Sequence, residues 1–372
     1  MYRFFSKDEF VSSLTISDNH TILNFVQDQI EVEKLTTISE TKKAVIYIND
    51  IHAYKNYDRF IRCAKKIKII IDFSYESGMS YECHDNIISH FRSLGIDKQD
   101  VLFILNTSAM VDSKLEHFNI CFFDYFAADA VRRLSIDTFS QTRVEQRPLR
   151  LNLLIAKLKK IPRYLTLYCF YKKNLLDNSV LSVLASHDDI TFHNLQFPDI
   201  EEDFYNTIKK YYGPRYDNLS ERNLGRNTVG VSYIGWPNDP KLYDESAVSV
   251  ICETSERWSG YTPEFITEKT YRTMANRHPF VVQGSPGILK HLKNQGYKTF
   301  DKIIHESYDD SIEENIKIIE QVVDTGIDLC KKIVDNSNLI QEIVDHNYNK
   351  LVEIGKKEKE KLSEHLLRFI ST

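Results

Sequence analysis

The sequence has no long apolar run, no closely spaced cysteine pair and no D-x-D pair of aspartates. Because no stretch of about 18 or more apolar residues occurs, we expect no transmembrane helix. The six cysteines stand alone, which is typical of buried thiols in a reducing compartment. The nearest approach to a metal-ligand cluster is Glu82–Asp85, where consecutive residues cannot easily face one ion, so no metal site is predicted.

The amino-terminal segment MYRFFSKDEF carries charges where a signal peptide needs an apolar stretch. The composition, with 42% hydrophobic and 27% charged residues and no low-complexity tract, is typical of a globular protein. A length of 372 residues predicts two domains of roughly 100–200 residues each. These features favour a cytoplasmic protein without a membrane span.

The net charge of −5 argues against a general nucleic-acid-binding protein, but the charge is unevenly distributed. Residues 132–173, which we call the basic stretch, contain eleven Lys or Arg residues, opposed only by Asp137 and Glu145. The basic stretch therefore carries +9 and the rest of the chain −14. This pattern predicts a localised anionic ligand, and chance clustering on a solvated surface is the alternative.

The first half of the chain alternates strand-like and helix-like segments. Apolar runs predict strands at 42–50, 66–73, 100–106 and 118–126, and the apolar spacing over 85–95 predicts a helix. Strands that alternate with helices indicate βαβ units and a parallel sheet.

A polar segment with a proline, at 143–150, predicts a linker. A second alternation follows, with strands at 149–156, 246–254 and 279–284 and a helix at 164–177 whose first turn lies near Pro162. The predicted class is therefore α/β.

The last part of the chain, from about residue 312, has the 3–4 apolar spacing of helices. The predicted domains are thus 1–147 and 148–310, followed by helices over 311–372 that pack back across them. Eight of the 12 glycines and six of the nine prolines fall within 213–296, a loop-rich window where we expect the functional site. Ligands of open α/β sheets bind beyond the carboxyl ends of strands, so segments that follow strands are the candidates.

The first candidate segment is a helix start within YTPEFITEK. Thr262 or Thr267 can cap this helix, and Asn276–Pro279 ends it. With Thr267 as the cap, Glu268 and Lys269 occupy the first turn, where free backbone N–H groups suit a phosphate. Lys269 adds a positive charge for the phosphate, and the Glu268 carboxylate can accept the paired hydroxyls of a ribose. An ordinary exposed first turn is the alternative.

The second candidate is KLKKIPR, which follows the strand predicted at 149–156. Lys157, Lys159, Lys160 and Arg163 stand at a strand's carboxyl end, where a diphosphate would bind. Neither a G-x-G-x-x-G nor a Walker A sequence occurs, so side chains and a helix end would have to hold the phosphates. A plain basic loop is the alternative.

The third candidate, GSPG at 284–287, follows a strand and opens a helix. Ser285 is the expected N-cap and Pro286 the first helical residue. This segment can line the same cleft or be only a tight turn.

Two carboxylates in the first half, Asp72 and Glu76, follow the strand predicted at 66–73 and are candidates for a general base. We favour Glu76, because a carboxylate at the very end of a strand often caps the next turn. A carboxylate that is simply solvated is the alternative.

The segment CETSERWSGYTPEFITEKTYRTMANRHPFVVQG resembles the donor-site block of the α-1,3-fucosyltransferase family. It is more similar to glycosyltransferases encoded by bacteriophages, which share the pattern ITEKTYR…PF.V.GSPG.L..L...G.KTF. Some of those phage enzymes decorate modified bases in their own DNA. The resemblance is specific over about 255–300 and fainter over 150–180.

The resemblance implies a GT-B architecture, in which two Rossmann-like domains face each other across a cleft. The first domain would take the acceptor, and the second would take a nucleoside-diphosphate sugar as co-substrate, without a metal or other cofactor. Glu268 would bind the ribose, Lys269 a phosphate and Arg163 the diphosphate, and Glu253 would be the donor-site glutamate that follows the strand.

The chain departs from the family pattern at two places. Thr254 stands where the fucosyltransferases have Asn, and Ile155–Lys157 replaces a Leu-Asn-Arg triplet. The donor sugar therefore stays open. Three functions stay open as well: a transferase that modifies a base in phage DNA, a transferase acting on a surface glycan or lipid-linked saccharide, and an inactive nucleotide-binding or interaction protein.

Overall fold

A computed structural model places much of the chain in two α/β units. It describes residues 21–24, 44–48, 67–74, 81–106, 115–156, 161–184, 204, 207, 240–253, 265–309 and 326–371. Unit 1 comprises the chain up to Arg132 and from Ile354 onward, and unit 2 comprises Arg133–Glu353.

The division at Arg132 and Arg133 precedes the boundary that the sequence predicts between residues 147 and 148. Residues of the predicted linker region bond within unit 2. The backbone N–H of Val144 donates to Gln341 Oε1 at 3.1 Å, and Arg147 Nη1 donates to the carbonyl oxygen of Tyr243 at 3.0 Å. The polar texture of the linker thus reflects bonding to unit 2.

Unit 1 contains a parallel sheet with strand order β1-β2-β3-β4-β5. The strands are β1 (Thr21–Asn24), β2 (Ala44–Ile48), β3 (Ile67–Asp72), β4 (Val101–Leu105) and β5 (Asn119–Phe122). The sequence predicts all of these except β1. Residues 69–71 of β3 and all of β4 are buried and apolar because a parallel sheet is covered on both faces.

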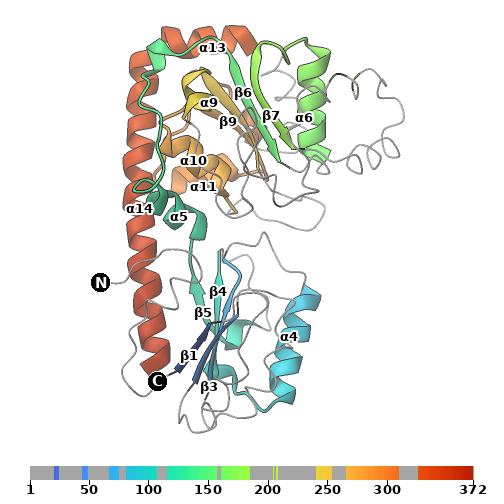
Figure 1. Ribbon diagram of the computed structural model, residues 1–372, viewed down its shortest axis with the longest axis vertical. Helices are drawn as coiled ribbons and strands as arrows, with labels where there is room; N and C mark the ends of the chain where they lie inside the picture. The colour runs from blue at the N-terminus through green and yellow to red at the C-terminus, as the bar shows by residue number, and fades with distance from the viewer. Residues whose placement is uncertain are drawn as a thin grey trace. The chain divides into compact units, whose positions relative to one another are not determined.

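Helices cover the sheet of unit 1 on both sides. Figure 1 shows α4 (Tyr81–Ser93) on one side and the end of α14 (Ser337–Ser371) on the other. Leu362, Leu366 and Phe369 of α14 join one apolar core with residues of β3 to β5 and of α5 (Tyr125–Arg133). The strand predicted at 118–126 is shorter than expected, because its last residues belong to α5.

Unit 2 contains a second parallel sheet with strand order β7-β6-β8-β9. Its strands are β6 (Leu151–Ala156), β7 (Ser179–Leu184), β8 (Val248–Cys252) and β9 (Phe280–Gln283), and its helices between strands are α6 (Ile161–Lys172), α9 (Lys241–Asp244) and α10 (Glu268–Ala275). The sequence predicts all but β7 and the short α9. Pro162 lies in the first turn of α6, as predicted.

The direction in which successive strands are added to the sheet reverses between β6 and β8. From β6 the chain crosses to β7 on one side, and from β8 it crosses to β9 on the other. Because such crossovers are right-handed, α6 and α10 cover opposite faces of the sheet. The carboxyl ends of β6 and β8 thus meet at a topological switch point, which is where ligands bind in open α/β sheets.

The remaining helices follow β9. In the described part of the chain these are α11 (Ile288–Asn294), α13 (Gly326–Asp335) and α14. Short 3₁₀ turns lie at Lys98–Asp100, Leu115–His117 and Val144–Gln146, before β9, and at Ser307–Asp309, after it. Asn347 of α14 joins unit 2 by two hydrogen bonds of 2.8 Å to the backbone of Lys298. Among the described residues no helix is both long enough and apolar enough to cross a membrane.

Candidate functional site

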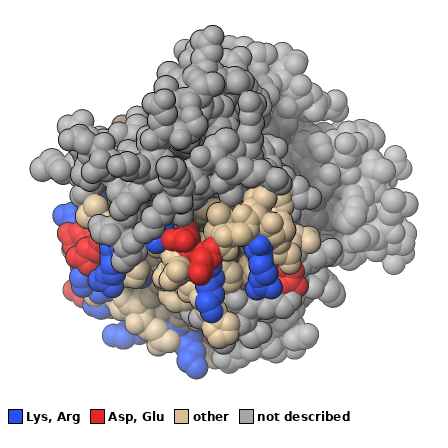
Figure 2. Space-filling view, turned by 90° about the horizontal axis from the view of Figure 1, so that it is seen from below, with Lys and Arg blue, Asp and Glu red and all other residues tan. Residues whose placement is uncertain are grey.

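The basic stretch offers less uncompensated charge than its composition predicts. Arg147 and Arg163 are buried, and Lys157, Lys159 and Lys160 lie outside the described residues. Ion pairs take up other arginines: Arg132 with Asp129 at 2.7 Å, Arg133 with Asp137 at 3.1 Å and Arg143 with Glu145 at 2.6 Å. Figure 2, which shows the molecule from below, has Lys and Arg beside Asp and Glu among the described residues of that face.

The switch point brings several predicted site residues to one edge of the unit 2 sheet. Glu253 directly follows β8, and Thr267, Glu268 and Lys269 form the start of α10, which connects β8 to β9. Arg163 lies in the first turn of α6, which follows β6. The sequence therefore places these residues correctly beyond strand ends, whereas the predicted Lys160 lies outside the described residues.

Thr267 is the N-cap of α10, as the sequence predicts. Its backbone is extended, with φ −107° and ψ −179°, and its side chain accepts a hydrogen bond from the backbone N–H of Lys269. The alternative cap, Thr262, lies outside the described residues. The helix ends at Ala275 with Asn276 as its C-cap, so both predicted ends are confirmed.

The Glu253 carboxylate is buried and bonds to the start of α10. Its Oε1 atom accepts hydrogen bonds from the Thr267 backbone N–H at 3.2 Å and from Thr270 Oγ1 at 2.6 Å, and its Oε2 atom accepts one from Thr267 Oγ1. A negative charge is favourable at a helix N-terminus. The first turn of α10 is thus already neutralised in part by a carboxylate of the protein.

Glu268 and Lys269 form an ion pair in the first turn of α10. Lys269 Nζ lies 2.8 Å from Glu268 Oε1 and 3.1 Å from Thr267 Oγ1. The Lys269 side chain is 11% exposed and that of Glu268 29%. Burial acts to raise the pKa of Glu268, but the charges of Lys269 and Arg272 outweigh it and lower that pKa to about 2. Glu268 is therefore an acceptor for hydroxyl groups at neutral pH.

The pKa of the Cys252 thiol shows which charges act at this edge of the sheet. Burial raises the pKa of its thiol to about 11, against the opposing effect of the positive charges of Arg163 and Lys269. Arg163 from α6 and Lys269 from α10 therefore both act on the last residue of β8. This arrangement places cations on both sides of the switch point.

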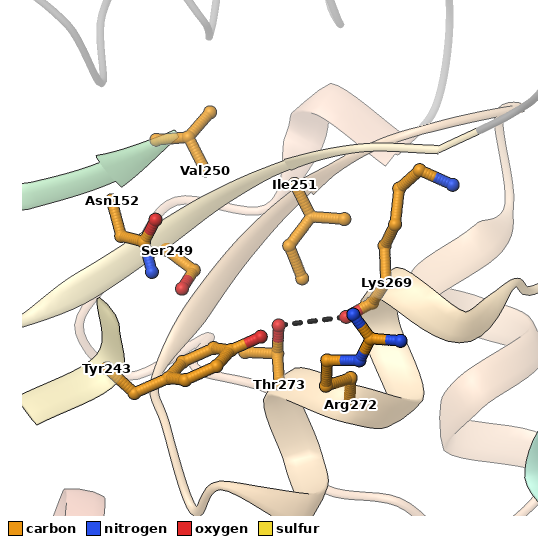
Figure 3. Close-up of a pocket in the computed structure, with 8 residues that line it drawn as sticks. All are labelled: Asn152, Tyr243, Ser249, Val250, Ile251, Lys269, Arg272 and Thr273. Carbon is orange, nitrogen blue, oxygen red and sulfur yellow. Dashed lines mark hydrogen bonds between the residues drawn. The ribbon is translucent and has the colours of Figure 1, made fainter. Parts of the chain in front are cut away.

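A small pocket lies between the sheet and α10 (Figure 3). Its volume of about 30 Å³ suits water and not a nucleotide. Asn152, Tyr243, Ser249, Val250, Ile251, Lys269, Arg272 and Thr273 line it. The Lys269 side chain runs away from Asn152 and Ser249 in Figure 3, so its ammonium belongs to the helix start.

Sequence reasoning missed two buried polar residues that fix the far end of α10. Arg147 Nη2 donates to the carbonyl oxygens of Asn276 at 3.4 Å and Arg277 at 3.2 Å, where the helix ends. His278 lies between Ser249 Oγ at 3.0 Å and the carbonyl oxygen of Ser246 at 2.9 Å. A polar residue in a local pattern gives no signal for such distant partners, so only the fold could show them.

The prediction that Ser285 caps the helix after β9 is wrong. Gly287 is the N-cap of α11, with φ 86°, and the buried Ser285 hydroxyl has no hydrogen-bond partner among the described residues. The Asp309 carboxylate instead accepts hydrogen bonds from the backbone N–H groups of Leu289 and Lys290, both at 3.0 Å. A carboxylate is the stronger partner for a helix start, and it comes from a distant part of the chain.

Of the two candidate bases in the first half of the chain, the structure describes Asp72 but not Glu76. Asp72 ends β3, and its Oδ1 atom accepts hydrogen bonds from the Ser74 backbone N–H at 2.9 Å and from Ser74 Oγ at 2.6 Å. It thus caps the turn, which is the reason for favouring Glu76. Glu76 itself lies outside the described residues.

No protein-family model matches the chain, and no curated protein matches it in sequence. What these side chains do must therefore be inferred from their chemistry and positions.

Proposed function

We propose that this chain is a glycosyltransferase of GT-B architecture, which transfers a sugar from a nucleoside diphosphate to an acceptor hydroxyl. The observation that carries the proposal is the pair Glu268 and Lys269 in the first turn of α10, beside the carboxyl end of β8. Two parallel sheets in separate units are compatible with that architecture.

The donor would bind across the switch point of unit 2. Lys269 and Arg163 supply positive charge for the two phosphates, and the ionised Glu268 accepts hydrogen bonds from the ribose hydroxyls. Because Lys269 already neutralises Glu268, a bound phosphate has to share the ammonium with that carboxylate. Lys160, outside the described residues, would be a further diphosphate ligand.

The reaction forms a bond between the acceptor oxygen and the anomeric carbon while the bond from that carbon to the diphosphate breaks. A carboxylate from the first half of the chain, with Glu76 favoured over Asp72, would take the proton of the acceptor hydroxyl. Cations and the start of α10 would stabilise the negative charge on the departing nucleoside diphosphate.

The acceptor we favour is a hydroxyl on a modified base in DNA. The charge of the basic stretch supports it, although the ion pairs at Arg132, Arg133 and Arg143 reduce that charge. DNA binding should weaken steeply as salt rises, because counterions are released from the phosphates. A glycan or lipid-linked acceptor should show little dependence on salt.

Thermal melting with UDP, GDP, CMP and TDP, each with and without Mg²⁺, tests the donor site. A ligand that binds only the folded protein raises the melting midpoint. We expect a rise with one nucleotide that does not depend on Mg²⁺, followed by release of free sugar from the matching nucleotide sugar. A shift without sugar release would favour the inactive nucleotide-binding protein, and no shift with any nucleotide would contradict the transferase.

A further inference from the structure

The hydroxyl of Thr267 links the Glu253 carboxylate to the Lys269 side chain. Thr267 Oγ1 lies within hydrogen-bond distance of Glu253 Oε2 on one side and of Lys269 Nζ, at 3.1 Å, on the other. The backbone N–H of Lys269 also points to it, at 3.5 Å. One hydroxyl therefore connects three groups at the start of α10.

The direction of each of these hydrogen bonds follows from the groups themselves. A hydroxyl has one proton to donate and two lone pairs to accept with. The Lys269 ammonium and backbone N–H can only donate, so the Thr267 proton cannot go to them. It goes to the Glu253 Oε2 atom, which accepts it. The lone pairs of Thr267 are thereby turned toward Lys269.

We propose that Glu253 is a positioning residue, which holds the Lys269 ammonium at the start of α10 through the Thr267 hydroxyl. Its two oxygens are engaged by Thr267 and Thr270, and the residue is 3% exposed. Glu253 therefore acts on Lys269 through Thr267 and not by direct contact with the ammonium. This role refines the donor-binding role that the resemblance implies for Glu253. Of the measurements below, only nucleotide binding rests on the proposed function.

The substitution Glu253→Gln tests this role with almost no change of shape. Oε1 accepts from the Thr267 backbone N–H, which cannot reverse, so the amide oxygen of Gln must take that place. The amide NH₂ then takes the place of Oε2 and donates to Thr267 Oγ1. The Thr267 proton then loses its acceptor. The amide NH₂, the Lys269 ammonium and the Lys269 backbone N–H compete for the two lone pairs of the hydroxyl oxygen, so the hydrogen bond that holds the Lys269 ammonium weakens.

The primary measurement is the rate at which acetic anhydride acetylates Lys269 in the folded protein, read by peptide mass spectrometry. Lys331, whose side chain is 55% exposed, serves as the internal reference. We expect Lys269 to react about tenfold faster in Glu253→Gln than in the natural protein, because one charge-assisted hydrogen bond is lost. An unchanged rate ratio in a folded variant would overturn the proposal.

Thr267 and Thr270 provide a matched pair of controls, since both are buried and both donate to Glu253, but of the two hydroxyls only that of Thr267 accepts a hydrogen bond from the Lys269 ammonium. Thr267→Val should release Lys269 as Glu253→Gln does, and Thr267→Ser should restore the slow rate. Thr270→Val should leave the rate within about twofold of the natural one. Equal acceleration by both valine variants would show general loosening of α10 and would overturn the proposal.

Nucleotide binding separates this proposal from the proposed function. If the natural protein binds a nucleoside diphosphate, Glu253→Gln should weaken that binding by about tenfold, and Thr267→Ser should retain it. If no nucleotide binds but Lys269 acetylation accelerates as expected, the positioning role stands and the transferase fails. If nucleotide binds and the acetylation rate of Lys269 is unchanged, the positioning role fails and the transferase stands.

Discussion

The backbone N–H of Leu289 donates a hydrogen bond of 3.0 Å to Asp309 Oδ1, so α11 begins on a carboxylate from a later turn of the chain. Asp309 is 8% exposed, and its carboxylate also binds the next backbone N–H, that of Lys290. The helix start and the Ser307–Asp309 turn therefore stabilise each other.

Replacing Asp309 with Ala should lower the free energy of unfolding by about 1–2 kcal/mol, because two backbone N–H groups lose their acceptor. Ser285→Ala is the matched control at the residue that local sequence favours as the cap. Its hydroxyl has no hydrogen-bond partner in the part of the chain that the structure describes, so its removal should be neutral or slightly stabilising. Urea unfolding measures both, and a larger loss for Ser285→Ala would contradict this assignment.

Gly355 of α14 should not tolerate alanine. A Cβ at this position would lie 2.5 Å from Val131 Cγ2 and 2.7 Å from the carbonyl oxygen of Ala127. Alanine normally favours a helix over glycine by about 1 kcal/mol, but overpacking costs about 1–3 kcal/mol. We expect a net loss of about 1 kcal/mol or more, measured by urea unfolding. Val131→Ala should recover part of it, and a more stable Gly355→Ala protein would show that α5 and α14 are farther apart.

Stability should fall as the pH drops below about 6.5, and His278 should cause part of that fall. Burial and the charge of Arg147 hold the pKa of His278 well below its ordinary value. The unfolded chain therefore binds a proton at a pH where the folded protein does not. The contribution of His278 to the free energy of unfolding is complete above the pKa that this residue has in the unfolded chain. It is lost as the pH falls toward the pKa in the folded protein, with a slope of at most about 1.4 kcal/mol per pH unit.

Urea unfolding between pH 7.5 and 5.5 checks this expectation for the natural protein and for His278→Gln. The variant should show a shallower slope over this range. Should it fail to fold, the imidazole NMR shifts of His278 in the natural protein should stay those of the neutral ring at pH 5.5. Equal slopes, or a ring that titrates near pH 6.5, would refute the expectation.

Lys269→Ala should reduce sugar transfer from the matching nucleotide sugar by at least about a hundredfold, because the departing diphosphate loses a cation. The melting midpoint should change little, since the Lys269–Glu268 pair is partly exposed. Lys293→Ala is the matched control, because that lysine forms a similar ion pair with Glu306 at 2.9 Å, away from the switch point. Equal turnover in the two variants would remove Lys269 from the site.

The sequence by itself determined the α/β class, most strands of both sheets and the two ends of α10. Apolar runs are decisive for strands buried on both faces, since no surface residue can interrupt them. Thr267 was predictable as a cap because capping is local chemistry within three residues. β1 escaped prediction because it has only four residues, and β7 because serines interrupt its apolar run.

Only the tertiary structure decided which polar groups are already engaged. The capping of α11 by Asp309, the bonding of Glu253 to Thr267 and Thr270, and the burial of Arg147 each join residues far apart in the chain. Spacing along a sequence carries no information about such partners. For this reason the sequence placed Glu253 and Lys269 at the same strand end, and only the fold showed that a threonine hydroxyl connects them.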